Sequence, residues 1–428
     1  MSKPLPKNLS ELFFSQLEKF AKKREFIIRN TKKFSAAGYL FCLMKAILTG
    51  NASFNELAME LKYSEPLSLT KQAVWKRTNS RAVAFMLDAL SLSLIEKWRE
   101  GTRRIPRLQR LFRRVLVQDS SQQRLPKSNH EDFPAHGNGK SVTAGVKVDL
   151  AIDLLNGRAV FSELYAATEQ DRNLGKNLVD LVRKRDLILR DRGYFSLPEF
   201  AYIEGKQAFW LSRLPANLII HDEAGGNLDP HLEDCRGGVL DMMVQLGKTG
   251  HRARLVAIRA SKEVAEKNLR SAKEQARMNG RTLSRSQQLR CHWHLVATNI
   301  QTEMMSAKSV SELYRCRWNI EIVFRAWKQS AKLDVALNRK SNEDHFQVLM
   351  LAAMIYQVLS LSVLTLIRDL SPAQRISMEK LFTDWSSNIL KCREMKELWD
   401  YAPDIRHLKN ESRKDSEPLE NTWIRLLS

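Results

Sequence analysis

Residues 145–168, GVKVDLAIDLLNGRAVFSELYAAT, set the fold class of this chain. They form two runs rich in β-branched and apolar residues, 145–158 and 159–168, and Asn156-Gly157 supplies a turn signal between them. Runs of this length and composition are typical of strands rather than helices. The segment therefore predicts two neighbouring strands joined by a tight turn.

The residues on either side extend this pair into a larger sheet. RVLVQDSS (114–121) has the alternating apolar character of a strand, a helical pattern covers 174–185, and a fourth β-rich run, DLILRDRGYF, follows at 186–195. Three consecutive strands, a helix and a fourth strand are the element order of a ribonuclease-H-like fold. We therefore predict an α/β chain built on a ribonuclease-H-like mixed sheet.

Further β-rich runs between 207 and about 300 surround a charged helical stretch that breaks at Gly280, and they predict an all-β insertion subdomain. Helical patterns precede and follow the sheet. The expected regions are a helical DNA-binding domain (1–97), the first part of the catalytic domain (98–206), the β-rich insertion (207–305), the second part of the catalytic domain (306–370) and a C-terminal helical region and tail (371–428).

Residues 53–90 have the outline of a helix-turn-helix, because a short amphipathic helix, a Pro-containing turn and a second helix follow one another. Ser68 or Thr70 is expected to cap the second helix. Lys76 and Arg77 on that helix are candidates for DNA binding. An ordinary helical hairpin with a solvated basic face explains the same pattern equally well.

The formal net charge of +21 indicates a polyanionic partner, since Lys and Arg that neutralise phosphates release counterions. Nucleic acid is the leading expectation and an anionic membrane is its competitor. The basic run 98–114 precedes the first strand, where it is placed to follow a phosphate backbone.

Residues 348–367 have the length of a membrane span, but polar residues interrupt them. We expect a helix buried in a large domain. The opening residues lack the apolar core of a secretory signal, so a cytoplasmic, nucleoid-associated protein is expected.

The stretch YRCRWNIEIVFRAWK (314–328) carries polar residues at helical spacing. At about 100° per residue, Tyr314, Arg317, Glu321 and Lys328 form one narrow polar stripe, with apolar residues on the other side. One face of such a helix can pack in a core while the other presents a carboxylate beside cations and a phenol.

Three acids are candidate metal ligands. Asp119 ends the strand VLVQDSS, Asp191 ends the strand LILRDRGYF, and Glu321 lies on the polar stripe. Strand ends at one edge of a sheet bring distant carboxylates together, and three carboxylates would bind two Mg²⁺ or Mn²⁺ ions for phosphoryl transfer. Other acids in the same strands are rivals, and surface or turn roles are expected for them: Asp149, Asp153 and Glu163.

D-S-S after one strand, D-R-G-Y-F after another and Y-x-x-R-x-x-x-E-x-x-x-x-x-x-K on a helix resemble the DDE transposases of the insertion-sequence type-four family. All four positions of the helical signature match, and the resemblance covers roughly residues 50 to 370. It implies that Asp119, Asp191 and Glu321 bind the catalytic metal ions. It also implies that three further residues contact the transposon end: Tyr314, Arg317 and Lys328.

The resemblance implies cut-and-paste transposition without a covalent enzyme intermediate, through end nicking, a DNA hairpin and strand transfer. Its partners would be terminal inverted repeats and target DNA, bound by a homodimer in a synaptic complex. A hairpin requires a flipped base, for which Trp293 is the candidate stacking residue and Trp210 and Trp318 are alternatives. A catalytically inactive DNA-binding regulator and a nuclease that cuts without joining remain alternative functions.

Overall fold

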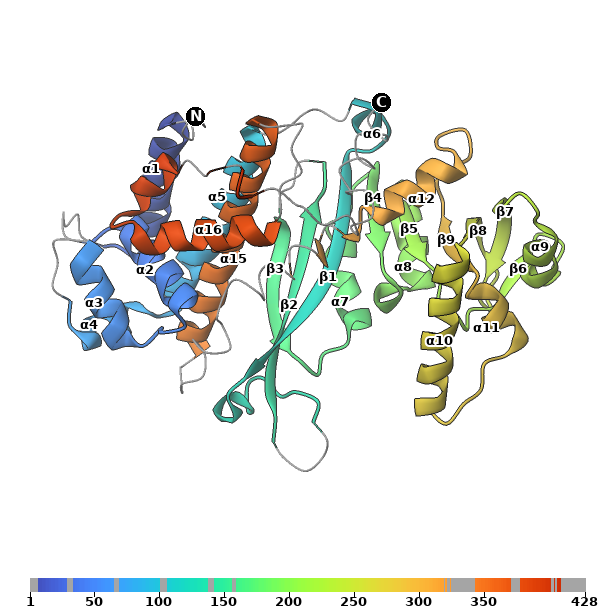
Figure 1. The fold of residues 1–428 in the computed structure, drawn as a ribbon, viewed down its shortest axis with the longest axis horizontal. Coiled ribbons are helices and arrows are strands. Elements are labelled where there is room, and N and C mark those ends of the chain that lie inside the picture. The colour runs from blue at the N-terminus through green and yellow to red at the C-terminus, as the bar shows by residue number, and fades with distance from the viewer. Residues whose placement is uncertain are drawn as a thin grey trace.

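The computed structural model of the chain describes residues 7–28, 34–64, 69–100, 106–137, 142–155, 159–318, 320–321, 324, 343–370, 378–401, 404 and 406–408. Within them, nine strands form one sheet in the order β3-β2-β1-β4-β5-β9-β8-β7-β6 (Figure 1). The strands are β1 (Arg114–Leu125), β2 (Ala144–Asp153), β3 (Ala159–Ala166), β4 (Asp186–Arg190), β5 (Phe209–Arg213), β6 (Ile220–Asp222), β7 (Val239–Leu246), β8 (His251–Arg259) and β9 (Trp293–Thr298).

The first five strands have the pairing of a ribonuclease-H-like sheet. β1, β2 and β3 are antiparallel neighbours, while β4 lies parallel to β1 and β5 lies parallel to β4. Parallel neighbours need a crossover, and helices α7 (Asp171–Val179) and α8 (Leu197–Gly205) lie in the connections to β4 and β5. The predicted fold class is therefore confirmed.

β1 is longer than the sequence pattern predicts. It continues to Leu125, pairing with β2 over its outer half from Asp119↔Leu150 to Leu125↔Ala144, whereas its pairing with β4 stops at Val117↔Leu189. The prediction that Asp119 ends a strand is therefore wrong, because the outer half of β1 is polar and has no apolar alternation to mark it. Asp119 lies inside β1, just past the point where pairing with β4 stops.

The remaining strands extend the same sheet. The segment 207–215, expected as the first strand of the insertion, contains β5 of the catalytic sheet, and β9 pairs antiparallel with β5. Helices α9 (Leu228–Asp234), α10 (Lys262–Met278) and α11 (Arg285–Arg290) accompany strands β6 to β9. Gly280 follows α10 with a φ of 64°, the left-handed conformation that ends helices, which confirms the predicted break.

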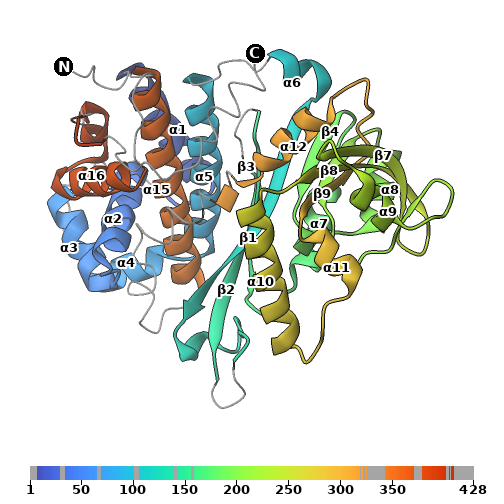
Figure 2. The same cartoon turned by 45° about the vertical axis from the view of Figure 1, so that its right-hand side comes forward.

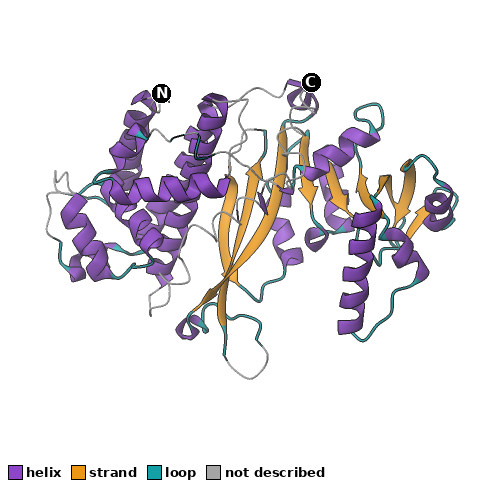
Figure 3. Ribbon diagram, viewed as in Figure 1, coloured by secondary structure: helices purple, strands orange, loops and turns teal. Residues whose placement is uncertain are grey.

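Helices from both ends of the sequence gather on the β3 side of the sheet, where they form one helical body (Figures 1, 2 and 3). These helices are α1 (Lys7–Lys23), α2 (Ala36–Thr49), α3 (Phe54–Ser64), α4 (Lys71–Arg77), α5 (Ser80–Glu100), α15 (Glu343–Leu370) and α16 (Met378–Lys391). α15 packs along α5 and against α2. Two further helices flank the catalytic strands: α6 (Pro106–Leu111) and α12 (Ala307–Arg315).

The apolar segment 348–367 lies in α15, and its residues 348–356 are all buried. The prediction of a buried helix is confirmed. Among the described residues, no helix combines the length and the apolar character needed to cross a membrane.

Candidate active site

Two of the candidate acids lie on one face of the sheet because of strand register. Val117 on β1 pairs with Leu189 on β4, and Asp119 and Asp191 each lie two residues farther along the chain. Side chains alternate along strands, so residues two apart share a face. Both acids therefore project from the same face at the same level, Asp119 from within β1 and Asp191 from the turn directly after β4.

The segment carrying Glu321 is held over this face by α12. Val310 and Leu313 of α12 pack into the core that also contains Leu211 and Val296. Arg254 on β8 fastens the chain before α12, because its guanidinium donates to the backbone oxygens of Ile300 at 3.2 Å and Met305 at 2.8 Å. The residues that follow α12 are thereby directed toward the acids of β1 and β4.

The prediction of one continuous helix over 314–328 is wrong. α12 ends at Arg315, and residues 316–317 form a turn before helical structure resumes. The backbone amides of Cys316 and Arg317 bond three residues back, to Leu313 and Tyr314, instead of four. Residue periodicity cannot reveal such a local tightening. Lys328, the last member of the predicted stripe, lies outside the described residues.

All three candidate acids meet at one buried guanidinium. Arg317 Nη1 lies 3.6 Å from Asp119 Oδ2, and its Nε lies 4.0 Å from Asp191 Oδ1. Its Nη2 donates to Glu321 Oε1. Acids that are far apart in the sequence therefore converge on one side chain, as the sequence predicts.

Burial changes the pKa values of the groups around Arg317. Burial raises the pKa of Asp119 to about 7, although the charge of Arg317 opposes the shift. Burial also raises the pKa of Tyr314 to about 12. Burial works against the charge of Arg317, yet Asp191, Tyr314 and Glu321 together raise its pKa above the ordinary value. Negative charge is thus concentrated around Arg317.

The donor set fits a hard divalent cation, since carboxylate oxygens are the ligands that Mg²⁺ and Mn²⁺ prefer. Within the described part of the chain, no three acidic, His or Cys side chains are close enough together to hold one metal ion. The reason is visible in the contacts of Arg317, whose guanidinium stands between Asp119, Asp191 and Glu321. A bound cation would therefore compete with this guanidinium for the same oxygens.

The residues preceding the two strand acids meet on the opposite face of the sheet. Arg190 Nη1 donates to Gln118 Oε1 at 2.7 Å, and Gln118 Nε2 donates to both oxygens of Asp149, at 3.1 and 2.9 Å. The hydroxyl of Tyr194 donates to Asp149 Oδ1 at 3.3 Å, and Arg190 also pairs with Glu199. Gln118, Asp149 and Arg190 are fully buried, so this back-face network ties the two acid-bearing strands together.

The rival acids have structural partners. Asp149 is enclosed in the back-face network, and burial raises its pKa to about 6. Asp153 Oδ1 accepts hydrogen bonds from the backbone amides of Val115 and Leu155. Glu163 accepts from the hydroxyl of Tyr165. The surface or turn role expected for Asp149 is therefore wrong, because this acid is fully buried inside β2. Asp153 bonds the turn at the end of β2 and Glu163 is exposed, as expected.

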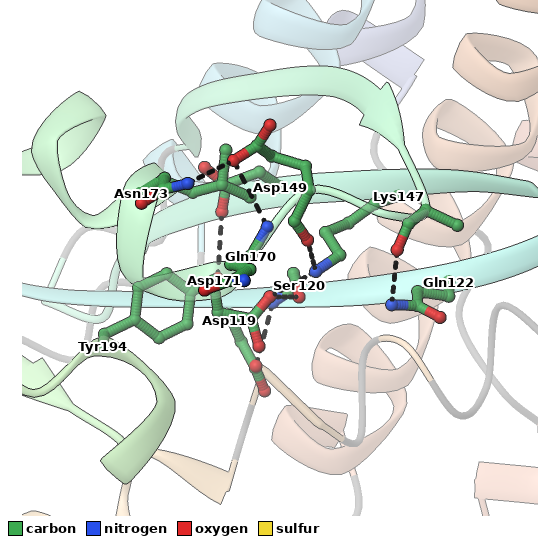
Figure 4. A network of polar contacts seen from close by, with 12 residues as sticks. Asp119, Ser120, Gln122, Lys147, Asp149, Gln170, Asp171, Asn173 and Tyr194 are labelled. Atoms are coloured by element: carbon green, nitrogen blue, oxygen red, sulfur yellow. Dashed lines mark hydrogen bonds and ion pairs between the residues drawn. The ribbon is translucent and has the colours of Figure 1, made fainter. Parts of the chain in front are cut away.

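Asp171 is a neighbour of the site that the sequence pattern did not reveal. It accepts hydrogen bonds from Ser120 Oγ at 2.7 Å and Lys147 Nζ at 2.8 Å (Figure 4). Figure 4 places Asp149, Asp171 and Tyr194 around the part of β1 that carries Asp119 and Ser120. The only sequence signal was its position as an acid in the first turn of α7.

The three candidate tryptophans differ in exposure. Trp293 is 3% exposed, with the guanidinium of Arg259 lying 4.6 Å from its ring centre, and Trp210 is fully buried. Trp318, which follows Arg317 directly, is 52% exposed. Base stacking on Trp293 stays a prediction and would require Arg259 to move.

The predicted helix-turn-helix residues lie on α4. Thr70 caps this helix by accepting from the Ala73 amide at 3.2 Å, as predicted, while Ser68 lies outside the described residues. Lys76 is exposed, whereas Arg77 lies over the ring of Phe34 at 5.3 Å. Lys76 is therefore the freer of the two predicted DNA-binding cations.

Comparison with known proteins agrees with this architecture. The family model described as a transposase DDE domain matches residues 110–358. The transposase for insertion sequence element IS231F of Bacillus thuringiensis subsp. israelensis is 27% identical over 340 residues, covering 74% of this chain and 71% of its own. The transposase for insertion sequence element IS1151 of Clostridium perfringens is 23% identical over 383 residues, covering 84% and 80%. The matched range includes β1, β4 and the segment with Arg317 and Glu321.

Proposed function

Because this chain belongs to the family of transposases with a DDE domain, of the insertion-sequence type-four kind, we propose that it moves its own insertion sequence by a cut-and-paste route. One observation carries the proposal. Asp119, Asp191 and Glu321, on three separate elements, converge on the guanidinium of Arg317. Structural acids are usually paired singly, so three acids around one cation are typical of a site built for metal-assisted phosphoryl transfer.

The three acids would hold two Mg²⁺ or Mn²⁺ ions. Such ions activate a water or hydroxyl nucleophile and neutralise charge that develops on the leaving oxygen. Without these ions, the positive charge of Arg317 balances the negative charge of the acids. Once the ions neutralise the acids, the guanidinium of Arg317 can bind a phosphodiester. Tyr314 lies beside Arg317 in the same pocket, and Lys328 is assigned to the transposon end by the family signature alone.

The proposed reaction has four steps. A water nicks one strand at the transposon end, and the freed 3′-hydroxyl attacks the opposite strand to form a hairpin. A second water opens the hairpin, and the 3′-hydroxyl then attacks the target DNA. The flipped base of the hairpin would stack on a tryptophan, Trp293 or the exposed Trp318.

DNA is recognised by more than the catalytic pocket. We assign Lys76 on α4, and Arg77 beside it, to the terminal inverted repeat, because α4 is the second helix of a helix-turn-helix-like pair and Lys76 is exposed. Two ends must be processed together for excision, so a homodimer in a synaptic complex is proposed. The net charge of +21 favours the binding of DNA, which is a polyanion.

The test uses the purified chain, Mg²⁺ and a duplex ending in the terminal repeat that flanks its gene. Asp119→Asn, Asp191→Asn and Glu321→Gln should each abolish end cleavage while end binding persists. Asp234→Asn, an exposed acid after β6, is the matched control and should cleave normally. Wild-type cleavage by all three variants would refute the assignment.

The same assay separates the alternatives. A DNA-binding regulator would bind the end tightly and give no cleavage with any divalent cation. A nuclease of this fold would cleave but leave no end joined to a target plasmid. Joined product from the wild-type chain excludes both.

A further inference from the structure

Two basic stretches that are far apart in the sequence meet at one edge of the catalytic sheet. The first is the end of the basic run 98–114, and the second is the run RKR at 183–185, directly before β4. The backbone amide of Arg113 donates to the carbonyl of Arg185 at 2.7 Å, and the amide of Arg185 donates to the carbonyl of Gln207 at 2.9 Å. The segments that enter β1, β4 and β5 are therefore joined side by side.

Arg185 holds this edge together. Its φ is 64°, a left-handed conformation that side chains other than Asn and Asp seldom adopt. Its guanidinium donates to the backbone carbonyl of Arg110, near the end of α6. The helix and the turn before β4 are thereby fixed against each other, and Figures 1 and 2 show α6 beside the starts of β1 and β4.

This edge carries an excess of exposed positive charge. We call its six exposed cations the cation edge: Arg110, Arg113, Arg183, Lys184, Arg185 and Lys206. None of them forms an ion pair within the described ranges, whereas the neighbouring Arg114 pairs with the fully buried Asp186. Glu204 accepts from the ring of Trp210, so Asp180 at the end of α7 is the one fully exposed acid that the described residues of these segments contain.

The cation edge lies at the opposite end of the strands from the catalytic acids. β4 has Arg185 before it and Asp191 after it. At about 3.3 Å per residue, the path from Arg185 to Asp191 spans about 20 Å. DNA rises about 3.4 Å per base pair, so this length corresponds to about six base pairs. The cation edge is therefore too far away to hold the phosphodiester that the acids would cleave.

The position of α4 indicates which part of the DNA would reach the cation edge. α4 lies in the helical body beyond β3, whereas α6 lies at the starts of β1 and β4, and the acid-bearing parts of β1 and β4 lie between the two helices (Figures 1 and 2). A duplex that extends from α4 to the acids therefore continues toward the cation edge. The DNA on that side of the cleavage point lies outside the transposon end.

We propose that the cation edge binds the DNA duplex that flanks the transposon end, about six base pairs beyond the cleaved phosphodiester. The proposal rests on the proposed function, in which α4 binds the terminal repeat and the acids cut beside it. Exposed Lys and Arg side chains repel one another only weakly in water, whereas each phosphate that they neutralise releases counterions. Phosphate contacts read no base sequence, which suits flanking DNA because it changes whenever the element moves.

The experiment varies the length of the flank and omits divalent ions, so that binding is measured without cleavage. End duplexes with no flank, with about four and with about twelve flanking base pairs are titrated by fluorescence anisotropy at several salt concentrations. The wild-type chain should bind the long-flank duplex about 10-fold more tightly than the other two. A triple variant, Arg113→Gln with Arg183→Gln and Lys184→Gln, should bind all three duplexes alike. Its salt dependence, the slope of log affinity against log salt, should fall by about 2 on the long-flank duplex alone.

A matched control separates the cation edge from general basicity. It removes three exposed lysines of α10, through Lys262→Gln, Lys267→Gln and Lys273→Gln, and should keep the wild-type gain from the long flank. If the triple variant fails to fold, Lys184→Gln combined with Lys206→Gln replaces it, because both side chains are exposed.

Three results would overturn the proposal. They are equal wild-type affinity for all three duplexes, a triple variant that keeps the gain from the long flank, and equal losses by variant and control on every duplex. A triple variant that binds flanked ends normally but fails to join them to a target plasmid would assign the edge to target DNA instead. A wild-type chain with flank-dependent binding that never cleaves in Mg²⁺ would contradict the proposed function and leave the cation edge supported.

Discussion

On β1 and β4, neighbouring residues belong to two very different environments. Asp119 and Asp191 face the front of the sheet, where their like charges lie beside Arg317. Gln118 and Arg190, each one residue earlier, face the back, where hydrogen bonds connect them to Asp149. Because strand side chains alternate, one step along the chain separates the reactive face from the stabilising face.

The difference shows how this protein holds an unfavourable site in place. The front face gathers carboxylates with like charges, and burial, with a smaller contribution from Glu321 and Asp191, raises the pKa of Asp119. The back face contains buried polar groups that hydrogen-bond to one another across β1, β2 and β4, although Arg190 Nε has no partner among the described residues. The hydrogen bonds behind the strands hold the charged groups in front of them in position for ligands, although those groups repel one another.

The largest expected contrast compares adjacent residues of β1. Asp119→Asn should lower end cleavage at least about 1,000-fold while the free energy of unfolding stays equal or rises, because one of several crowded charges is removed. Gln118→Met should lower the free energy of unfolding by about 2 kcal/mol by leaving buried partners unsatisfied. Cleavage assays and urea unfolding on both variants make the comparison. Equal losses of stability would erase the distinction between the faces.

Arg190→Met should break the back face most severely. It leaves Glu199 and the amide oxygen of Gln118 without their buried cation, so the free energy of unfolding should fall by about 4 kcal/mol. Arg252→Met, at the surface of β8, should change it by less than about 0.5 kcal/mol. Chemical denaturation of both variants tests this, and similar midpoints would contradict it.

The back face should also respond to pH through Asp149. Burial raises its pKa from 3.8 to about 6, so between these values the folded chain holds a proton that the unfolded chain has lost. The contribution of Asp149 to the free energy of unfolding should therefore fall by about 3 kcal/mol as pH rises from 4 to 6. Asp149→Asn cannot ionise and should lack this part of the pH dependence. Parallel wild-type and variant stability profiles would refute it.

The smallest effect concerns the cation of the front face. Removing the guanidinium in Arg317→Met leaves the three acids free for a divalent ion, so Mn²⁺ affinity of the DNA-free chain should rise about 10-fold. Arg315→Met, two residues earlier and exposed, should leave Mn²⁺ affinity unchanged. Titration calorimetry measures both. A weaker Mn²⁺ affinity in Arg317→Met would mean that Arg317 positions the acids instead of competing for them.

Local sequence patterns were sufficient for much of this architecture. The turn signal at Asn156-Gly157 and the apolar runs around it predicted β2 and β3, and Thr70 was a correct cap for α4. The convergence of Asp119 with Asp191 was predicted from strand ends, but it results from the parallel register of β1 and β4, because Asp119 lies inside β1. Each of these features depends on interactions between residues close in the chain, or on a general rule of sheets.

The features that were missed depend on pairing between distant segments. The position of Arg213 near Asp191 follows from the register of β4 against β5, which no local pattern records. The length of β1 depends on its pairing with β2, and the role of Asp171 depends on Ser120 and Lys147. The turn at 316–317 results from a change in backbone bonding that side-chain periodicity does not record.

The chain departs from the catalytic sheet at β5 and returns to it at β9, and these two strands are hydrogen-bonded neighbours. The segment between them is therefore an insertion whose two ends are held side by side. Since the entropy cost of closing a loop grows only slowly with its length, this position tolerates inserted segments of very different lengths. The length of the inserted segment can therefore change while β5 and β9 stay paired, provided that Arg254 on β8 still holds the chain before α12.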